Sequence, residues 1–142
     1  GNVLKAIGFD GRERDWNLSK KSSKKKLRRC SNLHLRARLV LRKLFSSSTI
    51  LEEIYLPGSN TITRSSILFA DFYLPKQRLL VEVHGEQHYK FNEFFHKTKS
   101  EFLKSKSRDR DKIRWCELNE IDIVTLKYTG SDDEWREKIL NR

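Results

Sequence analysis

Two acids and two histidines come close together in the middle of the chain, at Asp71, Glu82, His84 and His88. Side chains alternate between the two faces of a β-strand, so Glu82 and His84 would point the same way. Uncompensated charge inside a sheet costs several kcal/mol, roughly, unless the charge is paired or binds a metal. We therefore expect Asp71, Glu82 and His84 to meet at a divalent-metal site.

The order of the apolar runs predicts how these groups are brought together. Residues 67–74 and 79–84 are mostly apolar and flank a turn-prone stretch that begins at Pro75. This pattern predicts a β-hairpin. Asp71 lies on its first strand and Glu82 on its second, so a short turn sets the two acids side by side.

Apolar spacing elsewhere predicts three helices and two further strands. Ser31 is a suitable N-cap for the first helix, and Ser131 with Glu134 forms a capping-box pattern before the last. The expected elements are a helix over 33–45, a strand over 50–57, a helix over 101–119, a strand over 121–128 and a helix after 131. Together with the hairpin, this order predicts an α/β fold in which helices flank a mixed β-sheet.

The charge of the chain favours a polyanionic partner. The 142 residues carry a formal net charge of +11, and ten of the thirty lysines and arginines fall within residues 1–31, against three acids. We divide the chain into a basic N-terminal arm, residues 1–31, and one folded domain, residues 32–142. A solubilising tail or a localisation signal is the alternative interpretation of the arm. The cations expected to bind nucleic acid are Lys20, Lys21, Lys24, Lys25, Lys26, Arg28 and Arg29 in the arm, and Lys104, Arg108 and Lys112 on the later helix.

The sequence contains no sign of export or of membrane insertion. No apolar run approaches the ~20 residues that a membrane-spanning helix needs, and no signal-peptide pattern is present. The two cysteines, Cys30 and Cys116, are far apart, and we expect reduced thiols. These features favour an intracellular protein that is neither secreted nor bound to a membrane.

At this point the motifs resemble a known group of enzymes. Ala70-Asp71 followed by Glu82-Val83-His84 resembles the acid-plus-(D/E)xK signature of the PD-(D/E)xK nuclease superfamily, with His84 where the usual lysine stands. The Gly85 that follows, then His88 and the run over 108–111, are similar to the very-short-patch-repair endonucleases and the EDxHD homing endonucleases. The similarity covers about residues 33–128. It implies a restriction-endonuclease-like α/β core, a nuclease domain over 32–142, hydrolysis of DNA phosphodiester bonds, and magnesium as cofactor, with manganese expected to substitute.

The resemblance also implies roles for the metal ligands and the histidines. Asp71 would be the principal metal ligand, with Glu82 and the backbone carbonyl of Val83 as further ligands. His84 and His88 would activate or orient the attacking water.

Two acids complete the set that the resemblance implies. Asp111 would be the acid on the later helix. The family's first acid stands on the opening helix, which here contains no Asp or Glu. We expect Glu53, or Glu52 beside it, to replace that acid from the next strand.

The chemistry fits these residue types independently of the resemblance. A hard cation held by carboxylate and carbonyl oxygens acidifies a bound water and neutralises the charge that builds on a phosphoryl group. An imidazole, whose ordinary pKa lies near neutrality, can accept the proton of that water. Magnesium keeps several waters, so Asp71 and Glu82 would suffice as side-chain ligands.

Simpler interpretations of the same residues stay open. Asp71 could pair with Arg78, and Asp111 with Arg108 or Arg114, as an ordinary helical ion pair worth a few tenths of a kcal/mol. The four-residue spacing of the two histidines also suits a zinc pair. A third zinc ligand is not evident in the sequence, because both cysteines stand elsewhere.

We expect a small magnesium-dependent endonuclease acting on double-stranded DNA, of the homing or mobile-element kind. A homodimer on DNA would be needed for a double-strand break. The alternatives are a mismatch-repair nicking endonuclease, a nuclease-like binding module without catalysis, and RNA as the substrate.

Overall fold

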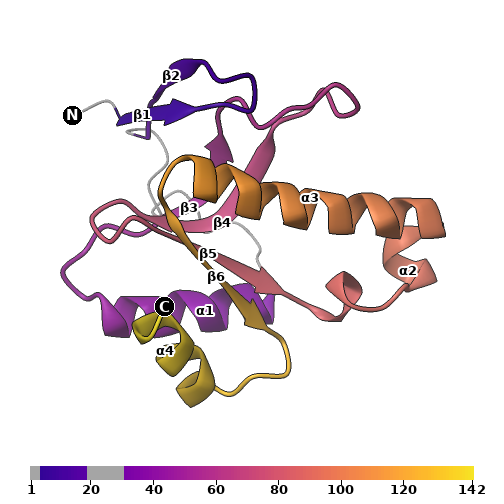
Figure 1. The fold of residues 1–142 in the computed structure, drawn as a ribbon. Helices are drawn as coiled ribbons and strands as arrows, with labels where there is room; N and C mark the ends of the chain where they lie inside the picture. Colours follow the sequence, from indigo (N-terminus) through magenta and orange to yellow (C-terminus); the bar gives the residue numbers. More distant parts are fainter. Residues whose placement is uncertain (1–3, 19–30) are drawn as a thin grey trace.

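A four-stranded mixed sheet forms the centre of the molecule (Figure 1). The computed structural model describes residues 4–18 and 31–142, so the expected DNA-binding cations from Lys20 to Arg29 lie outside the described residues. The strands are β3 (Leu51–Leu56), β4 (Leu68–Leu74), β5 (Leu79–His84) and β6 (Asp122–Lys127), in that spatial order. The first two pairs are antiparallel and β5–β6 is parallel. The predicted α/β fold with a mixed sheet flanked by helices is confirmed.

Helices cover both faces of this sheet (Figure 1). Helices α1 (Asn32–Leu44) and α4 (Asp132–Leu140) pack on one face, in a cluster with Leu79 and Val81 of β5. Helix α3 (Lys99–Leu118), which connects β5 to β6, packs on the other face, in a cluster with Leu80. The ends follow the predicted capping signals, because Ser31 Oγ accepts from the His34 N–H and Ser131 with Glu134 forms a capping box.

The alternation along β5 decides where its polar side chains point. Leu80 faces α3, so Glu82 and His84, which follow it at two-residue steps, are directed to the same side. Val81 and Val83 pack on the opposite side with α1 and α4. The predicted sharing of a face by Glu82 and His84 is confirmed.

The first part of the expected arm belongs to the fold. Strands β1 (Leu4–Ile7) and β2 (Glu13–Trp16) form an antiparallel hairpin above α3 (Figure 1). Trp16 is buried, stacks on Tyr73, and donates its indole N–H to the carbonyl of Tyr55. Residues 4–18 of the expected arm therefore pack on the folded domain through this buried aromatic group.

A short irregular connection joins β5 to α3. It contains a 3-10 turn, η2 (Glu86–His88), and a single-turn helix, α2 (Glu93–His96). Phe94 on α2 is 87% exposed. Within the described residues, no helix combines the length and the apolarity needed to cross a bilayer.

Candidate metal and catalytic centre

The two carboxylates lie where the pairing of β4 with β5 ends. The ladder runs from Leu74–Leu79 to Phe72–Val81 and then opens. Beyond it, Glu82 Oε2 accepts the Asp71 N–H at 2.8 Å, and Asp71 Oδ2 accepts the Val83 N–H at 2.8 Å. The two acids thus replace backbone partners of the ladder and are fixed beside each other. The expected meeting of Asp71 with Glu82 is present in the structure.

Helix α3 contributes two more side chains, Lys112 and Asp109, beside these carboxylates. Lys112 Nζ lies 2.6 Å from Glu82 Oε1. Asp109 Oδ2 lies 2.9 Å from His88 Nδ1, and its Oδ1 lies 3.8 Å from His84 Nε2. The rings of His84 and His88 stack at 3.9 Å between centroids. Both predicted histidines therefore belong to one cluster with both predicted carboxylates.

The structure places Asp109, rather than Asp111, beside the histidines. Asp111 is buried and pairs with Arg64 at 2.7 Å and with Arg114 at 3.2 Å. The pairing with Arg114 is the simpler alternative expected for it. Asp111 therefore binds the loop between β3 and β4 to α3, away from His88.

Lys112 is also in a different place from the one expected. Its side chain is only 16% exposed and faces Glu82, so it does not belong to an exposed DNA-binding surface. Helical spacing contains only a weak signal for both groups. Lys112 precedes the buried Trp115 and Cys116 by three and four residues, and Asp109 precedes Lys112 by three, which is compatible with both on the face toward the sheet.

Glu53 stays outside the cluster. Glu52 pairs with Phe72 and Ile54 with Ala70, but the Glu53–Asp71 pair between them is missing from the ladder. Glu53 is exposed and has a positive φ of 54°.

Its neighbour Glu52 occupies the position beside the opening helix. Glu52 Oε1 lies 2.7 Å from His34 Nε2, and its Oε2 lies 2.8 Å from Arg38 Nε. Both partners are on α1, so Glu52 connects the helix to the sheet. Of the two acids considered for the missing position, Glu52 is the one in contact with α1.

The electrostatics of the two sheet carboxylates differ. Burial and the negative charge of Glu82 raise the pKa of Asp71 from 3.8 to about 6. Burial would raise the pKa of Glu82 as well, but the His84 imidazole and the Lys112 ammonium lower it below its ordinary value. Of the two sheet carboxylates, Asp71 is thus the one whose charged form the fold disfavours.

Asp109 stays ionised for a different reason. Burial opposes its charge, but the hydrogen bond with His88 and the charges of His84, His88 and Lys112 lower its pKa below the ordinary value. A carboxylate bound to Nδ1 leaves Nε2 of the His88 ring as the basic atom. This arrangement suits a general base, since the acid holds the imidazole in a fixed orientation.

One pocket of the molecule lies beside this centre. A cavity of about 490 Å³ lies between η2, α2 and α3 and is lined by Gln87, Phe95, His96, Glu101, Lys104, Ser105 and Arg108. Gln87 and Arg108 are direct chain neighbours of His88 and Asp109, so this cavity adjoins the cluster.

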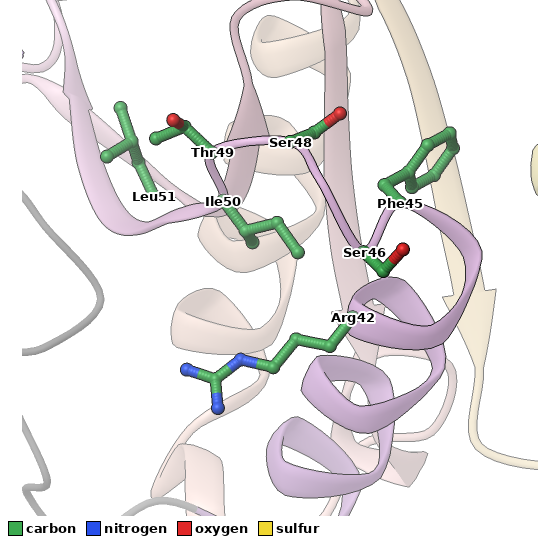
Figure 2. Close-up of a pocket in the computed structure, with 7 residues that line it drawn as sticks. All are labelled: Arg42, Phe45, Ser46, Ser48, Thr49, Ile50 and Leu51. Carbon is green, nitrogen blue, oxygen red and sulfur yellow. The ribbon is translucent and has the colours of Figure 1, made fainter.

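A second hollow, of about 300 Å³, lies where α1 leads into β3. Figure 2 shows Arg42 extending from α1 below Ile50, with Ser48 and Thr49 on the connecting segment above Ile50. Among the described residues, its lining contains no carboxylate and no imidazole. It therefore has no side chain suited to bind a cation or to accept a proton.

Comparison with known proteins gives partial matches. The chain is 44% identical over 62 residues to Uncharacterized protein 307L of Invertebrate iridescent virus 6, a match that covers 44% of this chain and 32% of that protein. It is 39% identical over 70 residues to Uncharacterized protein 033L of Invertebrate iridescent virus 3, covering 49% of this chain and 36% of that protein. The matched part thus spans about a third of each relative. No family model and no solved structure matches the chain.

Proposed function

We propose that this protein is a divalent-metal-dependent endonuclease that hydrolyses phosphodiester bonds in double-stranded DNA. The observation that carries the proposal is the meeting of Asp71 and Glu82 from the open end of a hairpin with His84, His88 and Asp109. These residues include oxygen ligands for a hard cation and an imidazole base that can accept a proton from water.

The residues fit a magnesium ion. Asp71 is half-buried, and its pKa is raised to about 6 by burial and by Glu82, so its ionised form needs a cation close by. Asp71 would be the principal ligand, joined by Glu82 and by the carbonyl of Val83, as the resemblance implies. The bound cation would supply an acidified water and would neutralise charge on the phosphoryl oxygens. Manganese would substitute for it.

The remaining residues of the cluster have distinct roles in this proposal. Asp109 orients His88 through the 2.9 Å hydrogen bond to Nδ1, and Nε2 of His88 accepts the proton of the attacking water. Lys112 holds Glu82 in place at 2.6 Å and keeps it ionised. His84 stacks under His88 and fixes the orientation of its ring.

The electrostatic features support DNA as the partner. The formal net charge is +11, and the cavity beside the cluster presents Lys104 and Arg108, both exposed. The basic residues over 20–29 would follow the phosphate backbone further. A single cluster cuts one strand, so a double-strand break would need a homodimer. Action on DNA would take place inside a cell, as in a homing or mobile-element nuclease.

A binding module without catalysis is the second candidate, and Lys112 favours it. Its ammonium lies 2.6 Å from Glu82, where it satisfies a carboxylate that a metal would otherwise use. A protein that had lost its metal would be stabilised by such a contact.

Nicking of supercoiled plasmid with magnesium or with EDTA, beside a filter-binding measurement on the same DNA, separates the two candidates. The proposal predicts open circles with magnesium and none with EDTA, at similar binding in both. Tight, salt-sensitive binding without cleavage of DNA under any metal would support the binding module. If the protein cleaved a matched RNA duplex and not DNA, the substrate would be RNA.

A further inference from the structure

The cluster contains a buried nitrogen without a hydrogen-bond partner among the described residues. Nε2 of His84 is buried and takes part in no hydrogen bond within the part of the chain that the structure describes. The His84 side chain is 10% exposed. A buried polar atom without a partner costs about 1–3 kcal/mol, so such an atom commonly marks a place for a ligand.

The groups around this nitrogen are spaced like ligands of one ion. Its nearest carboxylate oxygens are Glu82 Oε1 at 3.7 Å and Asp109 Oδ1 at 3.8 Å, too far for hydrogen bonds. Asp109 Oδ2 lies 2.9 Å from His88 Nδ1. One ligand atom from each of His84, His88 and Asp109 can be chosen so that all three lie within 4.8 Å of one another. Ligands held at about 2.0 Å from a tetrahedral ion are about 3.3 Å apart, a separation that small rotations of these side chains would reach.

We infer that His84, His88 and Asp109 form a second metal site, for a zinc-type transition ion. Two imidazoles and one carboxylate are a ligand set that zinc prefers and magnesium does not. The ligand that the sequence lacked comes from α3 instead of a cysteine. Three protein ligands leave a fourth position open for water.

Zinc in this site would have a defined effect on cleavage. His88 and Asp109 are the base and its orienting acid in the proposed function, so their use as zinc ligands would remove the base. Zinc at concentrations that fill the site would inhibit magnesium-dependent cleavage. This effect on cleavage rests on the proposed function, whereas zinc binding itself does not.

Zinc binding is tested by titrating the full chain with zinc chloride against a chromophoric chelator. Cys30 is replaced in all samples by Cys30→Ser, because a free thiolate would bind zinc. Cys116 stays, since burial raises the pKa of its thiol to about 12 and keeps it protonated. The variants are His84→Gln and Asp109→Asn, with His34→Gln on the opposite face as the matched control. Circular dichroism checks that each variant folds.

The inference predicts one zinc per chain, at least tenfold weaker binding in His84→Gln and in Asp109→Asn, and unchanged binding in His34→Gln. Asp71→Asn should abolish cleavage and leave zinc binding intact, which separates the two sites. Absence of zinc binding, or binding that His84→Gln and Asp109→Asn leave unaltered, would overturn the inference without affecting the nuclease proposal. Zinc binding at this site by a protein that cleaves no DNA would contradict only the nuclease proposal.

Discussion

The fold disfavours the ionised form of Asp71. Its pKa in the folded chain, about 6, lies above its ordinary value of 3.8, so the folded state binds the proton more tightly than the unfolded state does. The stability that this proton contributes is present below pH 3.8 and is lost as the pH rises through 6. A bound cation would remove the cost by compensating the charge.

The raised pKa of Asp71 makes the stability of the folded protein depend on pH. In EDTA, Asp71→Asn should gain stability over the wild type as the pH rises from 4 to 7, by about 2 kcal/mol. Asparagine can still accept the Val83 N–H, so the hairpin contact stays. Urea unfolding at several pH values measures this difference. Parallel stability curves for the two proteins would contradict the assigned pKa and its cause.

Glu52 shows the opposite behaviour. Burial disfavours its charge, but hydrogen bonds with His34 and Arg38 lower its pKa from 4.5 to about 2. This stabilisation is present above pH 4.5 and is lost as the pH falls through 2. Glu52→Gln should therefore cost about 3 kcal/mol at pH 7 and progressively less below pH 4.5. Glu53→Gln, at the exposed neighbouring position, is the control, and an equal loss in both variants would contradict this account.

The sequence indicated four of the residues in the cluster and missed two. Glu82 and His84 could be found because the period of two along a strand needs no long-range information. Asp71 followed from the short hairpin, and His88 from the resemblance to the nuclease families. Asp109 and Lys112 were missed because a helix rich in charge on all sides gives a weak indication of which face is buried. The contacts of Asp109 and Asp111 depend on the rotation of α3 against the sheet, which distant residues such as Trp115 decide.

At the scale of elements, the N-terminal hairpin is the main difference from the expectation. Strands β1 and β2 have four residues each, and the lysine-rich stretch that follows dominated the composition of residues 1–31. The hairpin is nevertheless attached by Trp16, which contacts Tyr73 and Trp115 in the core. The other boundaries agreed within a few residues, because caps and turns marked them.

Removing this attachment should destabilise the whole domain. Trp16→Ala deletes a buried indole and its hydrogen bond to Tyr55, and is expected to cost about 3–5 kcal/mol. Phe94→Ala, which also removes an aromatic ring but at an exposed position, should alter stability by less than about 0.5 kcal/mol. Thermal unfolding measures both. An unaltered melting temperature in Trp16→Ala would show that the hairpin is a separable arm after all.

At the scale of the whole molecule, charge governs the expected encounter with DNA. Affinity that rests on phosphate contacts falls with salt, because each contact releases condensed counterions. The double change Lys104→Ala with Arg108→Ala should weaken DNA binding and lower the slope of log K against log salt by about two. The exposed pair Lys43 and Lys76, changed to alanine together, is the control and should leave the slope close to that of the wild type. Equal slopes in both double variants would exclude the α3 surface from the interface.

Cleavage by the wild type and two matched asparagine variants tests the central proposal most directly. Single-turnover nicking of supercoiled DNA in magnesium is measured for the wild type, for Asp71→Asn in the cluster, and for Asp133→Asn, which is 90% exposed on α4. The account predicts cleavage by the wild type, a loss of at least about 100-fold in Asp71→Asn, and a rate within twofold of the wild type in Asp133→Asn. Cleavage that persists undiminished in Asp71→Asn would contradict it.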